Sequence, residues 1–123
     1  MQEVWKIQES IVMKLYTDEI QTAKLIELGF EKPTMAPPIL KWVNGEPTFE
    51  PQYTIGELIE MLQKQVYQIE DSGIPCDLNI HYDGGTWLIV YICERDGRFK
   101  TERLGLIDAL YDMIVKLKEG GVI

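Results

Sequence analysis

The sequence is poor in the residue types that most often build catalytic and metal sites. Its 123 residues include a single histidine, His81, and two cysteines, Cys76 and Cys93. Two cysteines are too few for the disulfide framework of a small secreted domain. One histidine without a CxxC or HxxxH spacing offers no recognisable zinc site. We therefore predict no catalytic, cofactor-binding or metal-binding residue, no cofactor and no enzymatic activity.

The sequence also lacks a long apolar run. No stretch approaches the roughly 18 uncharged apolar residues that a helix needs to cross a bilayer. Near the start of the chain, Glu3, Lys6 and Glu9 interrupt the apolar residues, so we expect no signal peptide. These two absences predict a cytoplasmic protein without a membrane partner.

Positive charge is scarce as well. Lysine and arginine total 12 against 20 aspartate and glutamate residues, which gives a net charge of −8 at pH 7. A chain this acidic repels phosphate backbones, so we expect no direct binding to nucleic acid. Two interpretations of the charge remain open. It serves solubility alone, or it forms a surface that binds a basic partner or mimics nucleic acid.

The overall composition is that of an ordinary globular protein. Hydrophobic residues make up 46% of the chain and charged residues 26%. A chain of 123 residues suits one domain and is long enough to bury a sizeable core. We expect a single domain over residues 1–123, and a loose attachment of residues 1–10 is left open.

The most apolar stretch, Cys76 to Cys93, predicts a β-hairpin around a two-residue Gly84-Gly85 turn. Counting outward from that turn pairs Cys76 with Cys93. It also predicts one core-facing set of side chains: Leu78, Ile80, Tyr82, Trp87, Ile89 and Tyr91. The facing cysteines leave two alternatives, a pair of buried thiols or an opportunistic disulfide.

The second strand of this hairpin is apolar on its other side too, through Leu88, Val90 and Ile92. That pattern predicts a central strand covered on both faces. A second turn at Asp96-Gly97 and a third strand over Arg98–Thr101 then give an antiparallel meander.

The first of three predicted helices covers residues 18–28. Thr17 is its expected N-cap. Gly29 suits the left-handed position after the helix, and Phe30 can pack back on Leu25 in a Schellman motif.

The second and third helices are predicted over 54–71 and 104–118. In the second, Thr54 and Glu57 form a capping box, and Tyr53 and Leu58 a hydrophobic staple. Its apolar stripe contains Leu58, Met61, Leu62, Val66 and Ile69. The third helix presents one broad apolar face, made by Leu106, Leu110, Met113, Ile114 and Leu117.

Two segments are harder to interpret. Residues 1–16 fit a helical face or a strand, and we favour a strand over 10–15. Residues 31–53 contain five prolines, which exclude a helix. Within them, Ile39 to Val43 predicts a short strand before an Asn44-Gly45 turn, with a brief return at Thr48-Phe49. The prolines favour an edge position for these strands.

Together these elements predict an α+β fold with two layers. An antiparallel β-meander of three to five strands carries about three helices, mostly on one face.

The order of several sequence runs is distinctive. The runs AKLIELGFEKP and YTIGELIEMLQK precede the apolar hairpin with its GTW, and IDALYDMIVKLKEGG follows it. In this the chain resembles a group of small uncharacterised proteins encoded in phages, prophages and mobile elements of gut-type bacteria. The resemblance covers roughly residues 17–123 and implies a mobile-element origin. It implies no reaction, and it assigns a role to no residue.

His81 and the Gly84-Gly85 pair are the two remaining candidates for a chemical site, and neither fits one. A nucleophile acting with His81 would have to lie beside it, but Cys76 and Cys93 lie about five residues away along strands that rise about 3.3 Å per residue. Gly84-Gly85 precedes a strand rather than a helix, so it is a turn and not a phosphate loop.

Trp5, Trp42 and Phe49 are the apolar residues that the predicted core accounts for least. They either pack in the core or, at the strand edge near Trp42, contact a protein partner, including by strand addition. We favour a non-enzymatic interaction module with a protein partner. A phage structural or assembly accessory is the alternative, and a small enzyme is the third candidate. Self-association through the Trp42 edge is left open.

Overall fold

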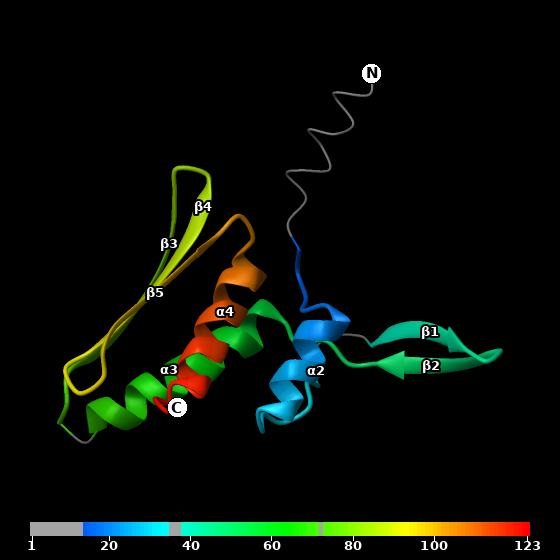
Figure 1. Cartoon of the computed structure of the whole chain (residues 1–123), viewed down its shortest axis with the longest axis horizontal. Coiled ribbons are helices and arrows are strands. Elements are labelled where there is room, and N and C mark those ends of the chain that lie inside the picture. The colour runs from blue at the N-terminus through cyan, green and yellow to red at the C-terminus, as the bar shows by residue number, and fades with distance from the viewer. Residues whose placement is uncertain (1–13, 35–37, 72) are drawn as a thin grey trace.

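A computed structural model describes residues 14–34, 38–71 and 73–123 of the chain (Figure 1). These residues form an α+β fold with three helices and two antiparallel sheets. Their elements in chain order are α2 (Glu19–Glu27), β1 (Ile39–Val43), β2 (Glu46–Glu50), α3 (Ile55–Asp71), β3 (Cys76–Asp83), β4 (Thr86–Cys93), β5 (Gly97–Arg103) and α4 (Leu106–Glu119). None of the described helices is both long and apolar enough to cross a membrane.

The larger sheet has the strand order β3-β4-β5, as the predicted meander requires. Gly84 and Gly85 both have positive φ, 60° and 93°. Two successive residues with positive φ form the two-residue turn whose twist matches that of the flanking strands. The predicted register is confirmed along the whole hairpin, from Asp83 opposite Thr86 to Cys76 opposite Cys93.

The second turn of the meander differs from the prediction. Cys93 pairs with Gly97, so the connection is the three residues 94–96 rather than Asp96-Gly97. Gly97 has a φ of 95°, and it therefore supplies the left-handed residue that a three-residue hairpin loop needs. The third strand also continues two residues beyond Thr101, to Arg103.

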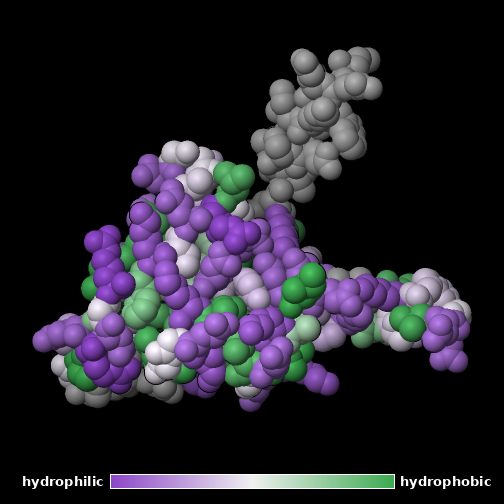
Figure 2. All heavy atoms as spheres, in the orientation of Figure 1, coloured by the Kyte–Doolittle hydropathy of each residue, from purple (hydrophilic) through white to green (hydrophobic). Residues whose placement is uncertain are grey.

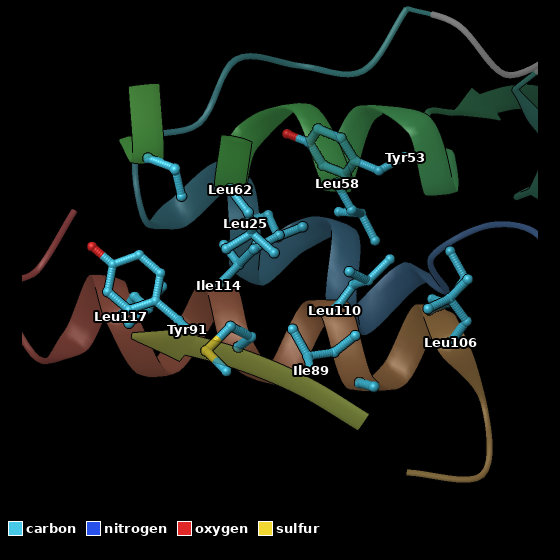
Figure 3. Close-up of a cluster of buried hydrophobic side chains, with 14 of the residues drawn as sticks. Leu25, Tyr53, Leu58, Leu62, Ile89, Tyr91, Leu106, Leu110, Ile114 and Leu117 are labelled. Carbon is cyan, nitrogen blue, oxygen red and sulfur yellow. The ribbon is translucent and has the colours of Figure 1, made fainter. Parts of the chain in front are cut away.

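The core lies between the larger sheet and the helices α3 and α4. Ile89 and Tyr91 of β4 are fully buried there beside α4, and Leu58 and Leu62 of α3 belong to the same cluster (Figure 3). The whole predicted apolar face of α4 is buried in the same cluster: Leu106, Leu110, Met113, Ile114 and Leu117. Helix α2 joins this cluster through Leu25.

Two expectations about the larger sheet are wrong. Tyr82 is not in the core but 60% exposed, because the hairpin tip extends past the start of α4 (Figure 1). There it makes a tilted ring contact with Trp87, with 5.3 Å between ring centroids. Strand β4 is central, but the described helices cover only one of its faces: on the other, Ile92 is exposed. Val90, on that same outer face, is only 5% exposed and stands outside the main core cluster.

The start of α2 is one residue later than predicted. Asp18, not Thr17, is the N-cap, and it forms a capping box with Gln21. Thr17 is not available as a cap because it joins the two ends of the segment 17–53. Its N–H donates to the Tyr53 carbonyl (3.0 Å), and its Oγ1 accepts from the Tyr53 N–H (2.9 Å).

The other helix ends follow the sequence signals. Phe30 N–H donates to the Leu25 carbonyl, which confirms the Schellman motif at Gly29. The Thr54–Glu57 capping box is present in both directions. Helix α4 begins after Gly105, two residues later than predicted, and no side chain caps it.

The predicted N-terminal strand over 10–15 falls mostly outside the described residues. Lys14 and Leu15, its described part, lie in no strand. Tyr16 makes an isolated antiparallel bridge to Thr54. Ile69, which completes the predicted stripe of α3, has a side chain outside the described set.

Strands β1 and β2 form a separate two-stranded sheet, which we call the ribbon (residues 39–50). Figure 1 shows it projecting sideways from the rest of the molecule. At its base, the Tyr53 hydroxyl donates to the Glu31 carbonyl and so holds together the chain entering and leaving the ribbon. The proline-bounded segment is therefore a protruding hairpin rather than an edge of the larger sheet.

Candidate functional site

The ribbon has a regular hairpin geometry that the sequence specifies. Asn44 and Gly45 both have positive φ, 53° and 79°, and asparagine and glycine are the residues that adopt this turn most readily. The turn fixes the register, in which Leu40 faces Phe49 and Trp42 faces Pro47. Directly opposite residues share a face of a hairpin. These four side chains therefore form one apolar face, which we call the ribbon's apolar face.

This face is open to solvent. Trp42 is 68% exposed, Phe49 is 66% exposed and Leu40 is half-exposed. Of the two alternatives for Trp42 and Phe49, packing in the core is therefore wrong, because no residue of the described core cluster lies on the projecting ribbon. Elsewhere the surface in view is mostly hydrophilic (Figure 2). Trp5, the third residue of the set, lies outside the described residues.

The opposite face of the ribbon, which we call the polar face, carries Lys41, Thr48 and Glu50 together with the exposed Val43, and it is attached to α2. Lys41 Nζ forms ion pairs with Glu19 of α2 and with Glu50 across the ribbon, the latter at 3.4 Å. The Thr48 hydroxyl donates to the Lys41 carbonyl at 3.0 Å. The hydrogen bond to Glu19 raises the pKa of Lys41, because both carboxylates favour its charged form. The polar face thus orients the ribbon and leaves the apolar face outward.

A cleft of about 470 Å³ lies beside α3, lined by Tyr53, Glu57, Met61 and neighbouring residues of 29–34. The side chains of Tyr53 and Glu57 in this cleft make structural hydrogen bonds. Glu57 accepts from Thr54 in the capping box and from the Thr34 N–H at 3.3 Å. Burial, helped by the Glu57 charge, raises the pKa of Tyr53 to about 12. This cleft lies where residues 29–34 meet the start of α3.

Cys76 and Cys93 lie side by side at the open end of the larger hairpin, and both are buried. No disulfide joins them in the structure. Burial, followed by hydrogen bonding to both cysteines, raises the pKa of the nearby Tyr91 hydroxyl. That hydroxyl also approaches Asp96 Oδ2 at 3.5 Å, and Asp96 pairs with Arg95. Of the two alternatives, the structure has the buried thiols.

His81 stands apart from all of these groups. It is exposed on the outer face of β3, opposite Leu88. It lines neither the cleft beside α3 nor a second cleft, of about 580 Å³, that lies beside the two cysteines. Among the described residues, no three His, Cys, Asp or Glu side chains are grouped to hold a metal ion. The Gly84-Gly85 pair is the turn that the sequence predicts.

Sequence reasoning named Trp42 and Phe49 but did not recognise the shared face. The register signal was present, because the Asn44-Gly45 turn pairs Leu40 with Phe49 and Trp42 with Pro47. What the sequence did not supply is the position of the ribbon outside the layers of the fold.

Comparison with known proteins adds no assignment. The chain matches no protein-family model, no curated protein and no solved structure.

Proposed function

We propose that this protein is a non-enzymatic protein-interaction module that binds its partner through the ribbon's apolar face. The observation that carries the proposal is the exposure of Leu40, Trp42 and Phe49 on one side of a projecting hairpin. Grouped apolar side chains at the surface of a soluble chain mark contact sites more often than isolated ones do. Tryptophan is also among the residues that contribute most to binding energy at protein interfaces.

The energetics of the ribbon favour a binding role. A lone two-stranded hairpin is only marginally stable in water, because it buries little apolar area. In this ribbon the aromatic side chains gain about 25 cal/mol for each Å² that a partner removes from water. A partner seated on Trp42 and Phe49 would therefore stabilise the ribbon as well as bind it.

The setting of the interaction comes from the sequence resemblance over residues 17–123. That resemblance implies that the protein comes from a mobile element, and we therefore propose a host or phage protein as its partner. The acidic chain, with its net charge of −8, favours a partner with a basic surface and repels a nucleic acid.

The test compares capture of partners from a bacterial lysate by the immobilised protein and by variants. Trp42→Ser combined with Phe49→Ser removes the aromatic rings of the apolar face. Val43→Ser is the matched control, because Val43 is exposed on the same strand but on the opposite face. We expect mass spectrometry to find a protein that the wild type and Val43→Ser retain and the double variant loses.

Each captured protein is then purified and its affinity measured by calorimetry. Equal binding to the wild type and to the Trp42→Ser/Phe49→Ser variant would show that the ribbon is not the binding surface.

A further inference from the structure

Cys76 and Cys93 face each other directly across the larger hairpin. The two-residue turn makes Asp83 and Thr86 a hydrogen-bonded pair, and such pairs alternate with non-hydrogen-bonded pairs along the strands. The cysteines are an odd number of pairs from the turn, so they form a non-hydrogen-bonded pair, with about 4.5 Å expected between their Cα atoms. Disulfides accept Cα separations of about 4.4 to 6.8 Å. The two strands can therefore be bridged without moving apart.

The Tyr91 side chain shows that the two thiols also point toward the same place. Its hydroxyl hydrogen-bonds with both cysteines, although they belong to different strands. Burial, followed by these hydrogen bonds, raises the pKa of Tyr91, so its hydroxyl keeps its proton. A protonated hydroxyl can donate to a thiolate on either sulfur, and such donation favours the charged form.

The second cleft, of about 580 Å³, gives access to the thiols, because both cysteines line it. Gly97, which pairs with Cys93 on β5, has no side chain to close this end of the sheet. A volume of this size can admit a small molecule. The two thiols differ in exposure: Cys76, on the edge strand β3, is 7% exposed, and Cys93, on the central strand β4, is 1% exposed. A small reagent therefore meets Cys76 first.

The charges of this cleft restrict the reagent. Its lining includes the carboxylates of Asp77 and Glu94 and a single cation, Arg98. The whole chain has a net charge of −8, which adds to the repulsion of anions. A reagent without net negative charge therefore suits the cleft best.

We propose that Cys76 and Cys93 form a dithiol modification site, which a low-molecular-weight disulfide without net negative charge oxidises to a cross-strand disulfide. In the structure no disulfide joins the two residues, so it represents the reduced state of this pair. The site lies on the larger hairpin and does not depend on the function proposed for the ribbon.

The oxidation follows thiol–disulfide exchange. The thiolate of Cys76 attacks one sulfur of the reagent. The S–S bond of the reagent breaks, a mixed disulfide forms on Cys76, and the expelled half takes up a proton as a thiol. Cys93 then loses its proton to solvent, and its thiolate attacks Cys76 Sγ and expels the second thiol. In total the cysteines lose two protons and two electrons, and the reagent gains them.

The test treats the folded full chain with hydroxyethyl disulfide, which is small and uncharged, and follows the intact mass after quenching in acid. We expect the wild type to lose two hydrogens and to carry no adduct, with the closed form exceeding the mixed disulfide by roughly tenfold or more. Peptide mapping should place the bond between Cys76 and Cys93.

Two variants separate the roles of the thiols, and alanine is used because it leaves no unpaired polar group in the core. In Cys93→Ala we expect the mixed disulfide on Cys76 to accumulate, because nothing resolves it. In Cys76→Ala we expect Cys93 to react roughly tenfold more slowly than Cys76 does, because it is less exposed. Circular dichroism checks that each variant is folded.

An anionic reagent of similar size, dithiodipropionate, tests the role of the cleft. For each reagent, the rate with the folded wild type is divided by the rate with the same protein unfolded in urea, which removes differences in intrinsic reactivity. We expect a higher ratio for hydroxyethyl disulfide. Equal ratios would overturn the preference for a reagent without negative charge.

The site itself is overturned by any of three results. Adducts that persist on both cysteines of the wild type would show that the sulfurs are not placed to bond. Disulfide-linked dimers in place of a closed single chain would show the same. Thiols that react only in urea would show that the cleft gives no access to them. None of these results affects the capture experiment, which tests the ribbon alone.

Discussion

The two hairpins of this molecule are built alike but differ in how far their apolar side chains are buried. Both turn through two residues with positive φ, Asn44-Gly45 in the ribbon and Gly84-Gly85 in the larger sheet. Both carry aromatic and aliphatic side chains on one face. Yet Ile89 in the larger hairpin is fully buried, whereas Trp42 in the ribbon is mostly exposed.

The difference lies in what each hairpin packs against. The larger hairpin gains β5 at its edge and the helices α3 and α4 on its core face. Within the described part of the chain, the ribbon has neither a third strand nor a helix over its apolar face. A local sequence pattern thus specifies a hairpin without specifying its cover. We propose that the ribbon takes its cover from another protein.

The largest expected contrast comes from shortening a buried side chain of the larger hairpin. Ile89→Ala leaves a cavity in the core and should lower the free energy of unfolding by about 2–5 kcal/mol. Urea denaturation followed by circular dichroism measures the loss. A loss below about 1 kcal/mol would mean that this face is far less tightly packed than the structure shows.

High pH tests the point at which the ribbon joins the core. The pKa of Tyr53 is raised to about 12 by burial, so its neutral form stabilises the fold fully below about pH 10. We expect this stabilisation to fall by about 2–3 kcal/mol as the pH rises from 10 through 12.

Tyr53→Phe cannot ionise and also lacks the hydrogen bond to the Glu31 carbonyl. In urea titrations, this variant should have a lower free energy of unfolding than the wild type at about pH 10. It should also lose less of that free energy as the pH rises to about 12. An equal loss in both proteins would assign the alkaline transition to other groups.

Matched turn substitutions compare the two hairpins directly. Gly85→Ala and Gly45→Ala each place a side chain at a positive φ, with no neighbouring atom within 4 Å, so backbone strain alone should cost about 1–2 kcal/mol. At Gly85 we expect this cost in global unfolding. At Gly45 we expect global stability to be unchanged and hydrogen exchange in β1 and β2 to accelerate. Equal global losses would show that the ribbon unfolds together with the core.

The smallest effect should come from the ribbon's apolar face. Leu40→Ala shortens an aliphatic side chain as Ile89→Ala does, but at a half-exposed position. We expect a change in unfolding free energy within about 0.5 kcal/mol by the same urea measurement. A loss comparable to that of Ile89→Ala would mean that Leu40 is already covered in solution.

Most of the fold was predictable because local signals agreed with one another. The Gly84-Gly85 turn fixed every pair of the larger hairpin, and the Thr54–Glu57 capping box fixed the start of α3. The errors arose where a distant partner decided the outcome. Thr17 does not cap α2 because Tyr53 occupies it, and Tyr82 is exposed because the hairpin outreaches the helices.

The candidate site was predictable only in part. The sequence identified Trp42 and Phe49 as unassigned apolar residues and Ile39–Val43 as a strand. It could not show whether those side chains are buried, because burial depends on where the ribbon lies relative to the layers of the fold. The alternation of Leu40 and Trp42 with Lys41 suits an edge of the core as well as it suits an exposed hairpin.

The hydrogen bond from Tyr53 to the Glu31 carbonyl has a consequence for how this protein could change over time. It brings together the two points at which residues 32–52 leave and rejoin the rest of the chain. Because loop-closure entropy depends only weakly on length, the segment between such clamped ends can be lengthened or exchanged at little thermodynamic cost. If the ribbon binds a partner as we propose, it is in this sense a replaceable recognition element, whose specificity can change while the core sequence is conserved.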